Sequence, residues 1–455
     1  MTRKLLLVGL SAISSLALAG PSPQTWTMEF LRSASLEATY VPGEVLVKFN
    51  RGAAASYRSD ALRAVRGQIK ATLKTKAMET FGDDEGIVVM KTSLRVPDAV
   101  AELNTMPGIE YAEPNYIVRT ADNCTDPDYV AGNLWGMYGE RSNPVNQYGS
   151  QVTEMWNMNR VGKSTVHVGV IDEGVLTTHY ELVQNIWVNP YDPVDGVDND
   201  GNGYVDDRNG WDFYNNNNSV YDGPSDDHGT HVAGTIGARG GNNVGLAGCC
   251  WIVKMIVCKF LGAGGGSTSD AIAAMDYITD LKIRHGLDIV ATNNSWGGGG
   301  FSSSLQAAIT RAGNANIIVV AAAGNGGGDF VGDNNDVTPF YPSSYTNANI
   351  ISVASITSTG ARSGFSNYGA TSVDIGAPGS DIKSTVPSGS STASFAYYSG
   401  TSMATPHVTG SLALHAAYRA DRGLALRTFL LNKGTPTASM AGITTTGDRL
   451  NAGTN

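Results

Sequence analysis

The feature that most constrains the fold is a repeated alternation, from residue 126 to the end, of short apolar runs with Ala-rich segments. The apolar runs have the length of buried strands, and the Ala-rich segments have the length of helices. Strands joined through helices run parallel, with helices covering both faces of the sheet. We therefore predict an α/β fold with a mostly parallel, doubly wound sheet and helices on both faces. The predicted strands are residues 166–171, 253–260, 289–293 and 317–321.

Three segments place a reactive side chain at the end of a predicted element. VGVIDEG (168–174) ends a strand on Asp172, HGTHVAG (228–234) starts a helix with His228, and GTSMATPH (400–407) presents Ser402 at the start of an apolar helix. Active sites of parallel sheets lie at the carboxyl ends of the strands, which is where Asp172 falls. Each residue alone has an ordinary alternative: a turn or helix-cap Asp, a structural His, a serine N-cap. His231 and His407 are expected to be structural.

Together these residue types suit nucleophilic hydrolysis. A serine hydroxyl is a weak nucleophile at neutral pH and must lose its proton to a neighbouring base, for which His is suited. An Asp behind the imidazole fixes its tautomer and stabilises the imidazolium. The chain order Asp, His, Ser is that of subtilisin and differs from the orders of chymotrypsin and the α/β-hydrolases.

All three segments resemble those of the subtilisin-like serine proteases, or subtilases. The resemblance extends to IIVVAAAGN (317–325), which is similar to the family's strand ending in the oxyanion asparagine. It implies that Asn325 and the Ser402 backbone N–H would receive the charge on the attacked carbonyl. Asn325 next to several glycines is also compatible with an ordinary loop position. Segments NSWG (294–297) and GAGGG (262–266) resemble the two edges that hold extended peptide, although a mobile Gly loop is the alternative for the second. The substrate-binding residues implied are Ser295, Trp296, Gly297, Gly264, Gly265, Ala323 and Gly324.

The expected activity is that of a serine endopeptidase with an acyl-enzyme intermediate. Ala322, Ala323 and Gly324 would line a fairly open apolar pocket, and no acidic cluster marks it. We therefore expect broad specificity with a preference for apolar or aromatic residues. Glu173 stands where Ser or Thr is frequent in the family, and its side chain is not expected to enter the chemistry.

The N-terminus has the pattern of a secretory signal peptide. A short basic start is followed by an apolar run from Leu5 to Leu18 and a small-x-small site, so residues 1–19 are the predicted signal, with cleavage after Ala19. No later segment has the ~20 uninterrupted apolar residues of a membrane span. The expected protein is exported, makes no use of a membrane and is a monomer.

A second unit is expected between the signal and the catalytic part. Strand patterns at residues 41–49, 86–91 and 108–118 alternate with helix patterns at 59–77 and 97–103, which predicts a small α+β unit. It resembles the inhibitory, folding-assisting propeptide of subtilases; a permanent N-terminal domain is the alternative. We predict a propeptide over residues 20–122, self-processing between Arg119 and Asp128, and a catalytic domain over residues 123–455.

An acidic loop follows the Asp segment. Asp198, Asp200 and Asn202 alternate ahead of Gly203, like the first half of an EF-hand, but the twelfth position is Asn209 and not Glu. We predict a calcium loop closed by Asp206 or Asp207, with the Tyr204 carbonyl as a further ligand; a solvated acidic loop is the alternative. The predicted ligands are Asp198, Asp200, Asn202, Tyr204 and Asp207.

The net charge of the chain bears on its binding partners, and its cysteines bear on possible disulfides. The chain has 41 acidic and 31 basic residues and a net charge of −10, which argues against a nucleic-acid partner.

The four cysteines allow three pairings. Cys250 with Cys258, leaving Cys124 with Cys249, is one hypothesis. An inactive peptide-binding relative and a calcium-dependent secreted binding protein are the alternative functions.

Overall fold

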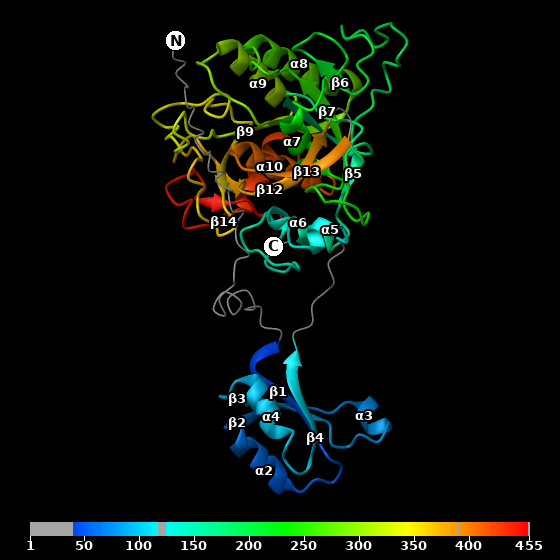
Figure 1. Cartoon of the computed structure of the whole chain (residues 1–455), viewed down its shortest axis with the longest axis vertical. Coiled ribbons are helices and arrows are strands. Elements are labelled where there is room, and N and C mark those ends of the chain that lie inside the picture. The colour runs from blue at the N-terminus through cyan, green and yellow to red at the C-terminus, as the bar shows by residue number, and fades with distance from the viewer. Residues whose placement is uncertain (1–39, 117–123, 390–391, 454–455) are drawn as a thin grey trace, which may run out of the picture. The chain divides into compact units, whose positions relative to one another are not determined.

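The computed structural model describes residues 40–116, 124–389 and 392–453. The chain forms two compact units that divide after Arg119 (Figure 1). The predicted signal peptide and part of the predicted processing segment lie outside the described residues. No helix within the described ranges has both the length and the apolar character that a membrane crossing requires.

The smaller unit is an antiparallel sheet of four strands in the order β2-β3-β1-β4. Helix α4 packs on β1 and β4 and helps to cover one apolar core. The elements in chain order are β1 (Tyr40–Phe49), α2 (Ala55–Ala64), β2 (Gly67–Leu73), α3 (Lys76–Thr80), β3 (Ile87–Thr92), α4 (Val96–Leu103) and β4 (Ile109–Tyr116).

The prediction of one helix over residues 59–77 is wrong. The helix α2 ends at Ala64, and β2 then pairs antiparallel with β3 along the edge of the sheet. No residue of β2 is buried, so the strand lacks the apolar alternation that marks a half-buried strand. Its conformation comes from pairing with β3, a contact between distant parts of the sequence.

The larger unit contains a nine-stranded sheet in the order β14-β15-β11-β10-β9-β8-β5-β7-β6, in which only β14 pairs antiparallel (Figure 1). Its strands are β5 (Gly162–Asp172), β6 (Gly210–Asp212), β7 (Ile252–Lys259), β8 (Asp288–Asn294), β9 (Ile318–Ala322), β10 (Ile350–Ile356), β11 (Ile375–Pro378), β14 (Thr435–Pro436) and β15 (Asp448–Arg449). A separate hairpin joins β12 (Ile382–Ser388) to β13 (Thr392–Tyr398). The helical segments are α5 (Pro127–Val130), η1 (Trp135–Met137), α6 (Val152–Trp156), α7 (Asp227–Gly237), α8 (Thr268–His285), α9 (Ser303–Asn314), α10 (Thr401–Ala416) and α11 (Gly423–Asn432).

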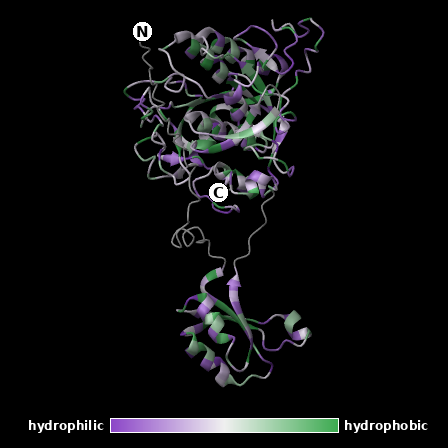
Figure 2. Cartoon of the chain, viewed as in Figure 1, coloured by the Kyte–Doolittle hydropathy of each residue, from purple (hydrophilic) through white to green (hydrophobic). Residues whose placement is uncertain are grey.

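Helices cover both faces of this sheet, as predicted. Alternate residues of β7 enter different apolar cores: Val253, Met255 and Val257 lie in one, and Ile256 and Cys258 in the other. The first core also takes the buried residues of α7, α10 and α11, and the second takes those of α8 and α9. Figure 2 shows the hydrophobic colours in the interior strands and helices and the hydrophilic colours mainly in the loops. The buried sheet forms a rigid base for the loops at its carboxyl edge.

The disulfide hypothesis is not supported, because all four cysteines lie among the described residues as free, buried thiols. Cys250 belongs to one core and Cys258 to the other, on opposite faces of the sheet. Cys258 also lies six positions after Ile252 along β7, which corresponds to about 20 Å in a strand. A disulfide needs Cα atoms within about 7 Å. The Cys124 thiol donates to Asp126 Oδ2 at 3.1 Å, whereas Cys249 Sγ contacts Met137 Sδ.

Candidate active site

Asp172 and His228 meet at the carboxyl edge of the sheet. β5 ends at Asp172, and α7 presents His228 in its first turn. His228 Nδ1 lies 2.8 Å from Asp172 Oδ1, and the Asp172 carboxylate is 1% exposed. A buried carboxylate at this distance holds the proton on Nδ1 and leaves Nε2 free to act as a base.

Two glycines permit this close approach. A Cβ at Gly229 would lie 2.2 Å from the Gly174 carbonyl oxygen and 3.2 Å from Asp172 Oδ1. Gly174 has φ +120°, and a Cβ there would lie 2.6 Å from Asp226 Oδ2. Any larger residue at either position would push the helix start away from the strand end.

Ser402 lies in the first turn of α10, close to the end of β8. Its Oγ donates to the Ser295 carbonyl at 3.0 Å, and the Ser295 hydroxyl donates to the Ser402 carbonyl at 2.8 Å. The serine hydroxyl is thus turned toward the Ser295 carbonyl. The first backbone N–H groups of a helix have no acceptor within the helix, which leaves the Ser402 N–H available.

Asn325 is oriented as an oxyanion donor requires. Its Oδ1 accepts from the Thr401 backbone N–H at 2.8 Å and from the Thr401 hydroxyl at 2.9 Å, so its amide nitrogen points the other way. A Cβ built on Gly400 would lie 3.5 Å from both Asn325 Nδ2 and the Ser402 nitrogen. Two N–H donors therefore border one small space beside Ser402, which suits a developing oxyanion.

Glu173 contacts the same helix start, which sequence analysis did not anticipate. Its Oε1 accepts from the His228 backbone N–H at 2.6 Å. Burial, followed by the neighbouring Asp172 charge, raises the pKa of Glu173 to about 7. Burial lowers the pKa of His228, but Asp172, with Glu173 and Asp227 behind it, outweighs this and raises it above its ordinary value.

Lys259, at the end of β7, is a buried cation behind this site. Its Nζ donates to the Glu173 carbonyl, to Asp226 Oδ1 at 2.9 Å and to the Leu261 carbonyl at 3.1 Å. It therefore ties the ends of β5 and β7 to the segment that precedes α7. A single charged residue after an apolar run was the sequence signal for this role.

The residues expected to bind substrate are divided between a pocket and the core. Gly265, Trp296 and Gly297 line a pocket of about 260 Å³ with Phe260, and the Trp296 ring packs edge-on against Phe260 at 4.7 Å. Ala323 is instead fully buried with Ala354 and Val373, so only its backbone could face a substrate. Gly264 is exposed in a tight turn in which Gly262 and Gly265 exchange backbone hydrogen bonds.

In the acidic loop, Asn202 links three of the other expected calcium ligands: its backbone N–H lies 3.1 Å from both Asp198 Oδ1 and Asp200 Oδ1, and its side chain lies 2.9 Å from Asp207 Oδ2. Asp198 accepts the backbone N–H groups of Gly201 at 2.7 Å and Gly203 at 2.9 Å. Asp207 turns into the core, where it accepts from Tyr277 at 2.6 Å, and burial raises its pKa to about 6. Within the described residues, no group of three or more His, Cys, Asp or Glu side chains is arranged to hold a metal.

The remaining expected ligands make other contacts. Asp200 Oδ2 lies 3.1 Å from His285 Nε2, which fixes the loop to the end of α8. The Asn202 side chain donates to Asp207, and the Tyr204 ring packs on Trp211. A buried carboxylate oxygen that lacks a partner lies elsewhere, at Glu181 Oε1, in a side chain whose other oxygen accepts from Asn242.

His231 and His407 are both buried, in keeping with a structural role. The His231 ring stacks on Tyr398 at 4.5 Å, and its Nε2 lies 2.9 Å from the Ile382 carbonyl oxygen. His407 Nδ1 lies 2.9 Å from the Met403 carbonyl oxygen. Burial lowers the pKa of both imidazoles, to about 3 for His231 and about 4 for His407.

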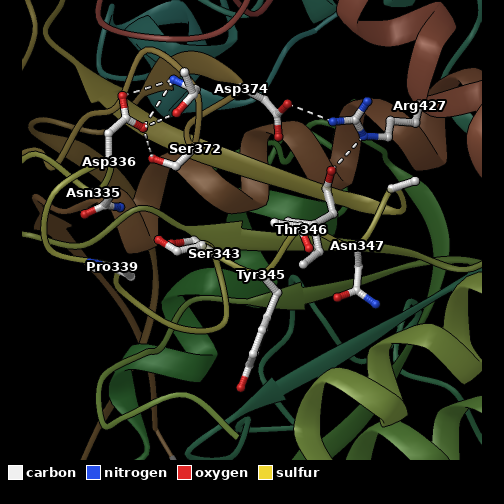
Figure 3. Close-up of a pocket in the computed structure, with 14 residues that line it drawn as sticks. Asn335, Asp336, Pro339, Ser343, Tyr345, Thr346, Asn347, Ser372, Asp374 and Arg427 are labelled. Atoms are coloured by element: carbon white, nitrogen blue, oxygen red, sulfur yellow. Dashed lines mark hydrogen bonds and ion pairs between the residues drawn. The ribbon is translucent and has the colours of Figure 1, made fainter. Parts of the chain in front are cut away.

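A polar pocket of about 480 Å³ is separate from this site (Figure 3). Arg427 pairs with Asp374 at 2.7 Å at one side of it, and Ser372 donates to Asp336 at the other. None of the predicted catalytic or substrate-binding residues lines this pocket. Although this pocket is large, we do not assign it as the reaction site.

Comparison with known proteins gives the family. Residues 163–446 match the model of the subtilase family, and residues 32–115 match that of the fervidolysin N-terminal prodomain. A thermophilic serine proteinase of Bacillus sp. (strain AK1) is 34% identical over 382 residues, 84% of this chain and 79% of that protein. An extracellular serine proteinase of Thermus sp. is 33% identical over 423 residues, 90% and 88% of the two chains.

A solved structure of a protease from Pseudoalteromonas arctica is also similar. It has a TM-score of 0.57 at 30% identity and covers 72% of this chain and 97% of its own. The fold, the match to the family model and the similar proteins all indicate the same family. The chain belongs to the subtilase family and is a serine endopeptidase with an N-terminal prodomain.

Proposed function

We propose that the protein is a secreted, self-processing endopeptidase in which Asp172, His228 and Ser402 form the catalytic triad. The observation that carries this proposal is the 2.8 Å contact of His228 with the buried Asp172, in a unit whose helix α10 has Ser402 in its first turn. An inactive relative would have no need to keep this pair together with the two N–H donors of the oxyanion site.

The chemistry follows from these contacts. His228 Nε2 takes the Ser402 proton as Oγ attacks the peptide carbonyl, and Asp172 stabilises the resulting imidazolium. Asn325 Nδ2 and the Ser402 N–H receive the oxyanion. His228 then protonates the leaving amine, which gives an acyl-enzyme, and the same groups direct water onto the ester.

The proposed specificity is broad, with a preference for apolar or aromatic residues. Support comes from the pocket between Phe260, Trp296 and Tyr341, whose large side chains are apolar and which is bordered by glycines. Exposed glycines leave backbone groups accessible, so an extended polypeptide can lie along this rim. A peptide library cleaved only after Arg or Lys would contradict this specificity.

The proposed partners are polypeptide substrates and the chain's own N-terminal unit, which would act as an intramolecular inhibitor until residues 20–122 are removed. We expect no nucleic-acid or membrane partner and a monomer. The prodomain match and the name of the extracellular Thermus relative support a secreted zymogen. N-terminal sequencing of secreted protein that still begins at Gly20 would contradict processing.

The test compares the native chain with Ser402→Ala by N-terminal sequencing, peptide cleavage and labelling with a serine-directed covalent reagent. We expect the variant to remain unprocessed, inactive and unlabelled. Ser411→Ala is the matched control, because Ser411 lies on the same helix and donates only to the His407 carbonyl. Equal activity of native chain and Ser402→Ala would exclude Ser402 as the nucleophile.

Calcium is part of the proposal as a structural ion. The alternating carboxylates around Asp200 support it, and the unpartnered Glu181 Oε1 marks a second place where a cation would satisfy a buried oxygen. Thermal unfolding with calcium and with a chelator tests binding. Asp198→Asn and Glu181→Gln distinguish the two places, because only the variant at the true site loses the calcium-dependent stabilisation. Identical unfolding under both conditions would contradict calcium binding.

A further inference from the structure

Phe340 occupies the slot between the two strand ends that flank the nucleophile. A Cβ built on Gly297 would lie 2.3 Å from Phe340 Cε1, and one built on Gly324 would lie 3.2 Å from Phe340 Cδ1. Gly297 follows β8 and Gly324 follows β9, and these strands are paired neighbours. A Cβ on Gly324 would also lie 2.5 Å from Asn367 Nδ2, so the Phe340 ring contacts both glycine positions and shares the space at Gly324 with Asn367.

The backbone of Phe340 is fixed. Its N–H donates to the Ser344 hydroxyl at 3.0 Å, and its carbonyl accepts from Ser343 Oγ at 2.7 Å. The next carbonyl, that of Tyr341, accepts from the Gly298 N–H at 2.9 Å, which joins this segment to the wall of the slot. The ring is therefore held in the slot by the same backbone that builds one side of it.

The slot opens next to the reacting atoms. Gly324 directly precedes Asn325, the proposed oxyanion donor, and the Ser295 carbonyl lies 3.0 Å from Ser402 Oγ. A carbonyl placed between these groups must direct the side chain of its own residue into the space between segments 295–297 and 322–324. That is the space which the Phe340 ring fills.

We propose that Phe340 closes this slot and restricts cleavage to peptide bonds that follow a small residue, namely glycine, alanine or serine. This inference deepens the proposed function and rests on it. It replaces the broad apolar or aromatic preference at the residue before the scissile bond, and it leaves that preference to the pocket beside Trp296, which is lined by Gly297–Gly300 and does not include Phe340. That pocket would select an apolar side chain at another position of the same peptide.

The physical basis is steric. A leucine or phenylalanine side chain before the scissile bond would have to expel the ring from its packed position, whereas a methyl group adds little volume. A single methylene in an apolar enzyme pocket changes kcat/KM by about 10- to 200-fold. We expect at least a tenfold lower kcat/KM for leucine and phenylalanine than for alanine at this position.

The experiment uses peptides that differ only in the residue before the scissile bond, alanine, leucine or phenylalanine, with the processed native enzyme and Phe340→Ala. We expect the native enzyme to favour alanine and the variant to gain cleavage after leucine and phenylalanine, with cleavage after alanine largely kept. Phe301→Ala is the matched control, because Phe301 packs on the outer side of Tyr341 and Tyr345 and should leave the preference unchanged.

The outcomes separate this inference from the proposed function. Native enzyme that cleaves after phenylalanine as well as after alanine would overturn the role of Phe340 and leave the protease intact. The same profile in Phe340→Ala as in the native enzyme would also overturn it. Native protein that cleaves none of the three peptides and takes no serine-directed label would overturn both proposals.

Discussion

The two units of this chain differ in what their sheets can bury. The small unit covers one core with antiparallel strands, and Glu44 is a charged residue that reaches only 4% exposure there, with Lys70 and Asn115 as partners. The large unit buries its parallel sheet on both faces and holds Asp172, Lys259 and Asp226 at one edge, at 1%, 2% and 3% exposure.

This difference shows why the chemistry is confined to one unit. A buried charge is costly unless neighbouring groups compensate it, and several segments must converge to supply such partners. The carboxyl edge of a parallel sheet brings β5, β7, β8 and β9 together there, whereas each strand of a small antiparallel sheet is half exposed. Four predictions test this contrast.

The largest effect is expected from Asp172→Asn. An amide cannot hold His228 in the required tautomer, and the comparable change in serine proteases lowers kcat by roughly 10⁴-fold. Both variants are measured as the rate of self-processing of the full chain, which the matched change in the small unit, Glu44→Gln, should leave unchanged. A comparable loss in both variants would break the contrast between the units.

The next effect is expected from Asn325→Ala. Loss of one oxyanion donor should lower kcat by about 10²- to 10³-fold with KM little changed, a magnitude known from subtilisin itself. Asn104 is the matched amide of the small unit, where it exchanges hydrogen bonds with the Ala112 backbone. Asn104→Ala should instead destabilise its unit by about 1–3 kcal/mol, measured by denaturant unfolding, and leave kcat unaltered.

Core truncations should sharpen the comparison in stability. Leu103→Ala and Leu412→Ala each remove a fully buried side chain and should cost about 2–5 kcal/mol. Because the small unit has one core cluster, the same loss removes a larger share of its stability. Unfolding of the full chain, with Ser402→Ala added to prevent processing, should show the transition of the small unit shifted most. Equal shifts in both transitions would contradict this.

The smallest effect concerns Glu173 and pH. Its folded-state pKa, about 7, lies above its ordinary value of 4.5, so the unfolded chain releases this proton first as pH rises. Its contribution to stability is present below about pH 4.5 and lost by about pH 7. Glu173→Gln should abolish this fall in thermal stability.

The same substitution should change the pH dependence of catalysis. The Glu173 charge helps to raise the pKa of His228, and activity requires a neutral imidazole. The acidic limb of the kcat/KM profile should therefore move to lower pH, by up to about one unit. An unchanged limb would mean that Glu173 acts through the backbone contact alone.

Much of the fold could be predicted from local patterns. The strands that carry the site are apolar runs of five to eight residues, and β5, β7, β8 and β9 match the predicted runs to within a few residues at either end. The edge strand β2 was missed because its residues have no apolar alternation and are held by β3. The burial of Glu44 could likewise not be predicted from the sequence, because its partners Lys70 and Asn115 come from distant segments.

The sequence alone determined the positions of the proposed reactive side chains, because each lies at or within three residues of the end of a predicted strand or helix. Only the tertiary structure decided what surrounds them. Phe340 lies 16 residues after Gly324 in an irregular segment, and no periodic pattern could place its ring between two glycines. Glu173 directly follows β5 and Lys259 ends β7, and the register of β5 with β7 brings them together. Local propensity acts over a few residues, whereas these contacts depend on how distant segments pack.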